Sequence, residues 1–407
     1  MQAAVSGYES SQLQSLDNVI CECLRLLRNA CAHGESVQNE VISDQSTVNV
    51  DVPRPVANVL QAFDVILKSD LNAIRDDSET PQSNRITSIA TRKMCWQCMA
   101  NVCVQNGSTQ QRIWLAFKEL FFDYFRCSSS AQQQPTNQRE CTMILFNIYI
   151  GGGIDEAGKE LLELLLTHLG SKHEHKVTDN DFFDIFLEHF IVEHRRLVPI
   201  YARLTPDHRL WLLYFIGDYM KNHHQPVIQT ALLQYICKEF KMKSDCILKT
   251  VTSYVDAIKP KEVVALLDVV AQASSDERYT HAMQDDGGLF LNVGCLLQTI
   301  TKLGKSNATQ EVNIFAPVQQ LGQIAPNSDE DASIERDVSY QLKSMLVRVI
   351  GNLAYRNRKN QDLAREMDII LAVLDSTNLD ARNPCKSYEE ASLSGYIICP
   401  FNFCCCC

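Results

Sequence analysis

The sequence contains one near-match to a nucleotide-binding phosphate loop. Residues Gly153 to Lys159 read Gly-Ile-Asp-Glu-Ala-Gly-Lys, which satisfies the spacing G-x-x-x-x-G-K of a loop whose backbone N–H groups surround phosphates. The next residue is Glu160, where Ser or Thr would bind magnesium, and Asp155 and Glu156 would oppose a polyphosphate. Because a turn between two helices explains the same residues, a nucleotide-binding protein is kept only as an alternative.

Cysteine and histidine residues raise the question of a redox or metal site. Cys95 and Cys98 have the spacing of a half-site, but no second cysteine pair with ligand spacing accompanies them. With Val102 they fall on one face of a predicted helix, which favours core packing. The four histidines that stand close together in pairs are expected at the solvated surface: His173, His175, His223 and His224. We therefore expect no catalytic residue, no cofactor and no metal, and a protein that is not an enzyme.

Four cysteines end the chain: Cys404, Cys405, Cys406 and Cys407. They are candidate lipidation sites, and a lipid-anchored peripheral protein is a second alternative. Neither helical period nor cap is visible from Cys385 onward. Residues 385–407 are therefore expected to form a divergent, disordered tail, and we hypothesise an alternative or frameshifted C-terminus.

A pattern built on asparagine occurs three times. Asn29, Asn101 and Asn352 are each followed five residues later by Gly or Asn (Gly34, Asn106, Asn357) and nine residues later by Gln (Gln38, Gln110, Gln361). The pattern predicts a helix that ends at a left-handed Gly or Asn, with the next helix starting near the Gln. A degenerate copy centres on Asn147, 46 residues after Asn101, which suits one repeat period.

Helical repeats bury their apolar faces only against neighbouring repeats, so the pattern predicts an all-α solenoid. The asparagine pattern is similar to that of armadillo repeats, and this resemblance implies a right-handed solenoid of the armadillo or HEAT type. Helices are expected at 13–33, 86–104, 112–125, 206–221, 339–355 and 360–374, and an acidic linker at 275–288. The expected divisions are helical repeats at 1–321, an acidic flexible linker at 322–336 and a final repeat at 337–384.

Composition and charge exclude further classes of function. The chain has 407 residues, a net charge of −11 and a pI near 5.4, which argue against a nucleic-acid-binding surface. The sequence contains no apolar run of about 18 residues, so we predict no transmembrane segment. The first residues do not resemble a signal peptide, so the 17 cysteines are expected in the reducing cytosol.

Several segments resemble the ataxin-10 family: residues 21–31, 117–121, 143–146 and 342–355, continuing through 375–384. Relative to that family we expect the chain to be N-terminally shortened, and the resemblance ends after Pro384. It implies an armadillo-like interaction scaffold that binds O-GlcNAc transferase and a G-protein β subunit and self-associates. It also implies roles in cytokinesis, neurite outgrowth and neuron survival, with perinuclear, centriole, basal-body and midbody locations.

The repeat asparagines are the candidate partner-binding residues: Asn29, Asn101, Asn147 and Asn352. Two interpretations remain open. A helical Asn can satisfy free carbonyl groups at a helix end, or a row of Asn side chains can hold the backbone of an extended peptide, as the resemblance to armadillo proteins implies.

Overall fold

The structure is a computed structural model that describes residues 2–42, 59–75, 87–130, 137–151, 158–175, 181–193, 197–250, 258–306 and 338–376. Within these ranges all regular secondary structure is helical, and no strand occurs. The all-α prediction is therefore confirmed. None of the described helices is both long and apolar enough to cross a membrane. The predicted linker 322–336 and the tail 385–407 lie outside the described residues.

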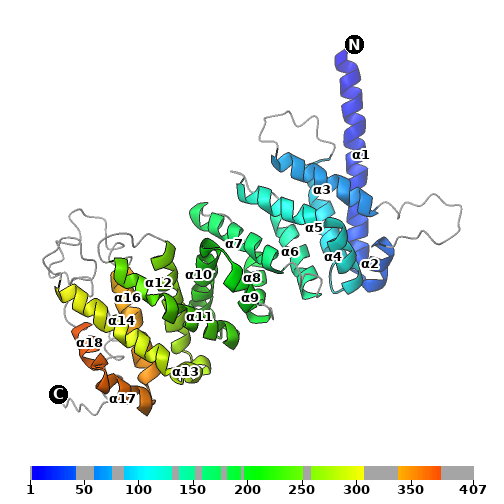
Figure 1. Cartoon of the computed structure of the whole chain (residues 1–407). Coiled ribbons are helices and arrows are strands. Elements are labelled where there is room, and N and C mark those ends of the chain that lie inside the picture. Colours follow the sequence, from blue (N-terminus) through cyan, green and yellow to red (C-terminus); the bar gives the residue numbers. More distant parts are fainter. Residues whose placement is uncertain are drawn as a thin grey trace. The chain divides into compact units, whose positions relative to one another are not determined.

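The chain divides into two compact units, residues 1–190 and 191–407. In unit 1 the helices form two layers (Figure 1). One layer contains α1 (Gln2–Cys31), α4 (Ile89–Val102), α6 (Gln138–Ile150) and α8 (Asp181–Glu193), and the other contains α3 (Val59–Arg75), α5 (Gly107–Ser130) and α7 (Gly158–His175). The short α2 (Glu35–Ile42) contacts α1, α3 and α5.

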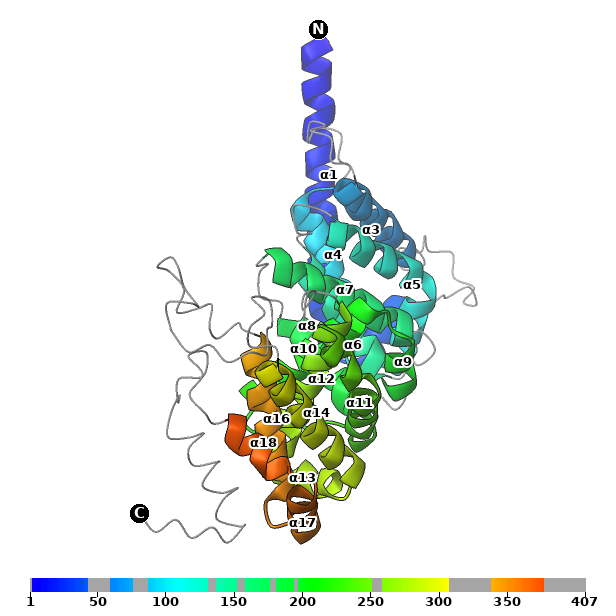
Figure 2. The same cartoon turned by 60° about the vertical axis from the view of Figure 1, so that its left-hand side comes forward.

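Unit 2 repeats the two-layer arrangement (Figure 2). One layer consists of α10 (Pro206–Asn222), α12 (Ile258–Ser274) and α16 (Val338–Ala354), and the other of α11 (Thr230–Lys243), α14 (Gly287–Ser306) and α18 (Ile369–Ser376). Shorter helices connect them: α9 (Leu197–Arg203), the 3-10 helix η4 (Ser244–Thr250), α13 (Glu277–Gln284) and α17 (Arg358–Glu366). Both units thus have the stacked layers expected of an α-solenoid.

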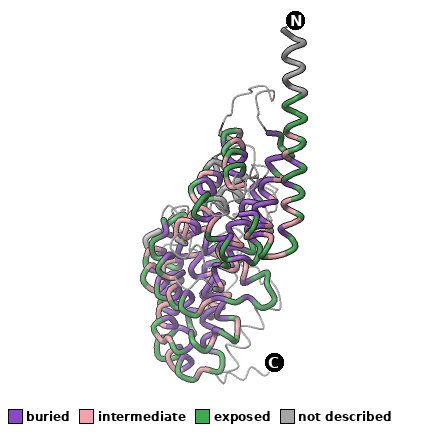
Figure 3. The backbone as a smooth tube through the Cα atoms, turned by 90° about the vertical axis from the view of Figure 1, so that its right-hand side faces the viewer, coloured by how far each residue is buried: buried purple, intermediate pink, exposed green. Residues whose placement is uncertain are grey.

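The core of unit 1 is rich in aromatic residues. The predicted aromatic helix at 112–125 lies within α5 and buries Phe117, Phe121 and Tyr124. The Trp96 ring of α4 lies 4.9 Å from the Tyr124 ring and 6.1 Å from the Phe121 ring, measured between centroids. Buried segments (purple) face the interior of the helical layers in Figure 3, whereas residues 12–20 of α1 are mostly exposed (green). Aromatic packing therefore joins α4 to α5.

The glutamine of the repeat pattern closes the turn between two helices. Its side chain donates a hydrogen bond to the carbonyl group seven residues earlier: Gln38 to Cys31 (3.2 Å), Gln110 to Cys103 (2.8 Å) and Gln361 to Ala354 (3.0 Å). These carbonyl groups stand at or next to the end of the preceding helix, where intrahelical partners run out. We call this contact the glutamine clasp.

The clasp also joins successive repeats. Gln38 Nε2 donates to the carbonyl groups of Asn101 (2.9 Å) and Val104 (3.3 Å) at the end of α4. Gln284 of α13 does the same in unit 2, with the carbonyl groups of Asn352 (3.2 Å) and Tyr355 (2.8 Å) at the end of α16. Gln284 is therefore the counterpart of Gln38, although the repeat pattern did not predict it.

The structure corrects the predicted cap. Gly34 has the expected positive φ of 115°, but in the other two copies the left-handed residues are Gln105 (φ 53°) and Arg356 (φ 54°), one position before the asparagine. Asn357 has a φ of −115° and accepts a hydrogen bond from Asn360 N at 3.1 Å. Asn106 similarly accepts from Thr109 N at 3.2 Å. These asparagines begin the next helix as N-caps, a position that Asn favours strongly.

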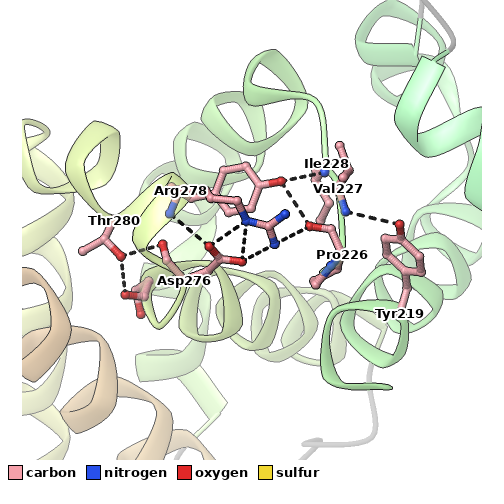
Figure 4. Close-up of polar contacts among 9 residues, drawn as sticks. Tyr219, Pro226, Val227, Ile228, Asp276, Arg278 and Thr280 are labelled. Atoms are coloured by element: carbon pink, nitrogen blue, oxygen red, sulfur yellow. Dashed lines mark hydrogen bonds and ion pairs between the residues drawn. The ribbon is translucent and has the colours of Figure 1, made fainter. Parts of the chain in front are cut away.

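The predicted acidic linker at 275–288 was also wrong, because it contains α13. Asp276 begins this helix as an N-cap and accepts from Arg278 N. Buried Tyr279 donates to the carbonyl group of Pro226 and accepts from Ile228 N (2.8 Å), while Arg278 Nη2 donates to the same carbonyl group (2.7 Å) (Figure 4). Tertiary contacts thus hold a helix in a segment whose local composition favours a loop.

The predicted helix at 360–374 is divided into two helices, α17 and α18, with Asp368 at a φ of 54° between them.

A buried ion-pair network holds α10, α11 and α12 together. Glu262 of α12 is 3 % exposed; its Oε1 lies 2.7 Å from Arg209 Nε and 2.8 Å from Lys243 Nζ. Lys243 also pairs with Glu239 at 2.8 Å. Burial alone would raise the pKa of Glu262, but the hydrogen bonds from Arg209 and Lys243 outweigh it and hold the pKa below its ordinary value.

Replacing Gln38 tests the clasp. Gln38→Ala leaves several helix-end carbonyl groups without their donor, so we expect the free energy of unfolding in urea to fall by about 2 kcal/mol. Gln111→Ala is the matched control, because Gln111 is an exposed helical glutamine and its loss should change stability by less than about 0.5 kcal/mol. Equal stabilities for the two variants would contradict the role assigned to the clasp.

Replacing Glu262 tests the ion-pair network and its pH dependence. Glu262→Gln should lower the free energy of unfolding at pH 7 by about 3 kcal/mol, because Arg209 and Lys243 lose their shared carboxylate. Because the pKa of Glu262 in the folded state lies below its ordinary value of 4.5, the ionised carboxylate stabilises the folded protein fully at pH values above 4.5. This contribution is lost as the pH falls through the folded-state pKa. Urea unfolding of both proteins from pH 7 to pH 3 should show the difference shrinking once the pH falls below 4.5, the ordinary pKa. A difference that stays constant over this range would argue against a carboxylate at this position.

Candidate functional site

An open groove of about 490 Å³ lies on unit 1, at the surface of the layer formed by α1, α4, α6 and α8. This volume is in the range of small-ligand sites, about 300–1,000 Å³. The groove is lined by Arg28, Asn29, Gln97, Asn101, Arg139, Glu140, Met143 and Phe182. Asn29 and Asn101, two of the four predicted partner-binding residues, are therefore brought together here.

Hydrogen bonds between side chains of successive helices form one wall of the groove. Arg28 Nη1 of α1 donates to Gln97 Oε1 of α4 at 2.9 Å, and Gln97 Nε2 donates to Glu140 Oε1 of α6 at 3.3 Å. Asn101 lies one helical turn after Gln97 and donates through Nδ2 to the carbonyl group of Arg28 at 3.0 Å. The polar row thus fixes the lateral order of the three helices at the groove.

Asn29 and Asn101 present complementary groups to the groove. The Asn29 Oδ1 atom accepts from Arg28 Nη2 at 2.9 Å, and its Nδ2 donors make no hydrogen bond among the described residues. Asn101 uses an Nδ2 donor for the Arg28 carbonyl group, and its Oδ1 acceptor has no donor among the same residues. A side-chain amide has donors and acceptors, so one residue offers a donor and the other an acceptor. A peptide unit can pair with both, because it carries one N–H donor and one C=O acceptor.

A buried ion pair beneath the groove supports α4. Asp70 of α3 and Arg92 of α4 are 3 % and 4 % exposed, and Asp70 Oδ1 lies 3.3 Å from Arg92 Nη1. Asp70 Oδ2 accepts from Trp96 Nε1 (2.9 Å) and from Asn137 Nδ2 (3.0 Å), the residue that precedes α6. One carboxylate therefore connects α3, α4 and the start of α6, which positions the helices that carry the groove.

The other two predicted asparagines lie elsewhere. Asn147 is half-buried on α6, one turn after Met143, and does not line the groove. Asn352 belongs to unit 2, where its Nδ2 donates to Ser274 Oγ and Ser275 Oγ, both at 3.0 Å. Asn352 thus makes the same kind of contact between repeats as Asn101 does.

The phosphate-loop candidate lacks its structural context. Residues 144–150, which precede it, belong to helix α6 instead of a strand, although a phosphate loop follows a strand. Gly153 to Ala157 lie outside the described residues. Lys159 stands in the first turn of α7 and pairs with Glu163 at 3.3 Å.

Cys95 and Cys98 lie in α4 and are fully buried, as core packing predicts. Burial raises the pKa of the Cys98 thiol to about 12, which disfavours the thiolate that redox chemistry or metal binding needs. No cluster of His, Cys, Asp or Glu suited to a metal ion occurs in the described part of the chain.

The remaining candidates fall partly outside the described residues. His223 and His224 are exposed, as predicted, and the His223 ring lies 4.4 Å from the Tyr219 ring. The side chains of His173 and His175 and the whole of Cys404, Cys405, Cys406 and Cys407 are not described.

The repeat pattern did not identify four groove residues whose side chains can contact a ligand: Gln97, Arg139, Glu140 and Phe182. Arg139 and Phe182 come from different helices, and the Arg139 guanidinium carbon lies 5.2 Å from the centre of the Phe182 ring. The sequence spacing could have identified Gln97, because this residue precedes Asn101 by one helical turn and therefore lies on the same helix face. The positions of the other three follow only from how α6 and α8 pack.

Comparisons of the sequence with known proteins relate the chain to ataxin-10. A family model for the spinocerebellar ataxia type 10 protein domain matches residues 342–393, so this match extends nine residues past Pro384, where the sequence analysis ended the resemblance. Ataxin-10 from Bos taurus is 27% identical over 389 residues, covering 92% of this chain and 73% of the relative. The human protein is 25% identical with the same coverage, and that of Xenopus tropicalis is 23% identical over 89% of this chain and 68% of its own. No solved structure matches.

Replacing Asp70 tests the support beneath the groove. Asp70→Asn leaves the buried Arg92 without a carboxylate, so the free energy of unfolding should fall by about 3–5 kcal/mol. Asp64→Asn in the same helix removes only an exposed pair with Lys68 and should cost less than about 1 kcal/mol. Urea unfolding followed by circular dichroism measures both. Similar losses for the two variants would show that the buried pair does not stabilise the groove helices.

Proposed function

Because the chain belongs to the ataxin-10 family, we propose that it is a non-enzymatic scaffold that binds other proteins. A stacked helical array offers an extended surface, and repeat proteins use such surfaces for partners. The family relationship supports this function at the level of protein interaction.

The observation that carries the proposal is the groove of unit 1. Asn29 offers a hydrogen-bond donor and Asn101 an acceptor at a surface formed by successive repeat helices. An extended peptide presents one N–H and one C=O per residue, so these side chains suit its backbone. Asn147 and Asn352 are further proposed contact residues, each for a different segment of a partner.

Finer aspects of the function follow from the family alone. We propose O-GlcNAc transferase and a G-protein β subunit as partners, together with self-association. We further propose roles in cytokinesis, neurite outgrowth and neuron survival, and cytoplasmic, perinuclear, centriole, basal-body and midbody locations. The nucleotide-binding and lipid-anchored alternatives gain no support from the comparisons, and the helical α6 argues against the first.

Removing the groove amides tests the proposal. Recovery of partner proteins by affinity purification from cell lysate, quantified by mass spectrometry, should fall about tenfold for the double variant Asn29→Ala, Asn101→Ala, because two hydrogen bonds to the partner are lost. Asn222→Ala removes an exposed asparagine at the end of α10 and should leave recovery unchanged.

Loss of the Asn101 contact with Arg28 also affects α4, so the thermal stability of each variant is measured in parallel. Asn29→Ala alone retains that contact and should reduce recovery without lowering the unfolding temperature. Unchanged recovery by the double variant would exclude the groove as the binding surface.

A further inference from the structure

The groove contains two guanidinium groups, those of Arg28 and Arg139, that have no carboxylate partner among the described residues. Within the described part of the chain, Arg28 donates to the neutral oxygens of Gln97 and Asn29 and to no carboxylate. Arg139 is exposed and makes no hydrogen bond or ion pair within the described residues. Other arginines of the chain do pair with acidic residues, such as Arg209 with Glu262 and Arg126 with Glu160. Since the chain carries a net charge of −11, a shortage of acidic residues does not explain why two arginines in one groove lack a carboxylate partner in the ranges that the structure describes.

The one carboxylate among the lining residues does not compensate both arginines. Glu140 is 9 % exposed and accepts a hydrogen bond from Gln97. Arg139 precedes it on α6, so their side chains point about 100° apart. With two arginines and one glutamate, the groove has a formal charge of +1 on an acidic protein. This charge complements an anionic group on a ligand.

An apolar surface lies next to the exposed guanidinium. Phe182 of α8 and Met143 of α6 are half-buried, and the Arg139 guanidinium carbon lies 5.2 Å from the centre of the Phe182 ring. This contact holds the guanidinium over the ring, while the N–H donors along its edge stay available to a carboxylate. The ring edge and the Met143 thioether offer contact area for an apolar side chain.

We infer that the groove binds an extended peptide of a partner protein that carries an acidic side chain next to an apolar one. The acidic group contacts Arg139 and approaches Arg28, the apolar group packs on Phe182 and Met143, and the peptide backbone lies along Asn29 and Asn101. This inference rests on the proposed function and adds the chemical class of the partner segment.

The first experiment selects binders from a phage-displayed library of random 12-residue peptides on the immobilised full-length chain. Enriched peptides should share an Asp or Glu adjacent to an apolar or aromatic residue. Enrichment of Lys-rich or Arg-rich peptides would overturn the inference. Failure to enrich any peptide whose binding is lost in the double variant Asn29→Ala, Asn101→Ala would overturn the proposed groove function as well.

The second experiment reverses the charge of the groove. One enriched peptide is compared with its Glu→Lys form by fluorescence polarisation, and the wild type should bind the acidic form about tenfold more tightly. Arg139→Glu should reverse this preference. Arg203→Glu makes the same change at an exposed arginine of α9 in unit 2 and should retain it.

Unchanged preference in Arg139→Glu would overturn the inference. If the peptides bind with equal affinity regardless of charge, and the double asparagine variant still abolishes binding, the groove function stands and only the acidic specificity fails.

Discussion

The carbonyl groups at the ends of the repeat helices impose the constraint on which this fold depends. A helix leaves its last four carbonyl groups without intrahelical partners, and a stack of short helices brings many such ends together. Here glutamine side chains from the following helix supply donors, as Gln110 does for Cys103 and Gln361 for Ala354. Gln38 and Gln284 extend the same solution to the neighbouring repeat. The same type of contact therefore contributes both to the turns and to the stacking of repeats.

The candidate binding surface is a consequence of this stacking. Because successive repeats are joined at the ends of α1 and α4, Asn29 and Asn101 come to the same groove. Beneath it, the carboxylate of Asp70 links α3, α4 and the start of α6. Rigid support of this kind reduces the side-chain ordering that a bound peptide must impose, which favours binding.

The sequence predicted elements that depend on local spacing and missed those that depend on tertiary contact. Gln38, Gln110 and Gln361 were recognised because their distance from the repeat asparagine is constant. The N-cap role of Asn106 and Asn357 was missed because Gly34, in the corresponding place, adopts a left-handed conformation that asparagine also tolerates. Helix α13 was missed because burial of Tyr279 and capping by Asp276 override an acidic local composition. No spacing rule connects Arg139 with Phe182, so the chemistry of the groove required the structure.

Site-directed photocrosslinking is the most direct test of the central claim that proteins bind at this groove. A benzophenone amino acid would replace Met143 in the groove or Leu115, which is 75 % exposed on α5 in the other layer of unit 1. Irradiation of the full-length protein in cell lysate should yield covalent adducts with discrete proteins from position 143 and not from position 115. Adducts of equal yield and composition from both positions, or adducts from position 115 alone, would contradict the account.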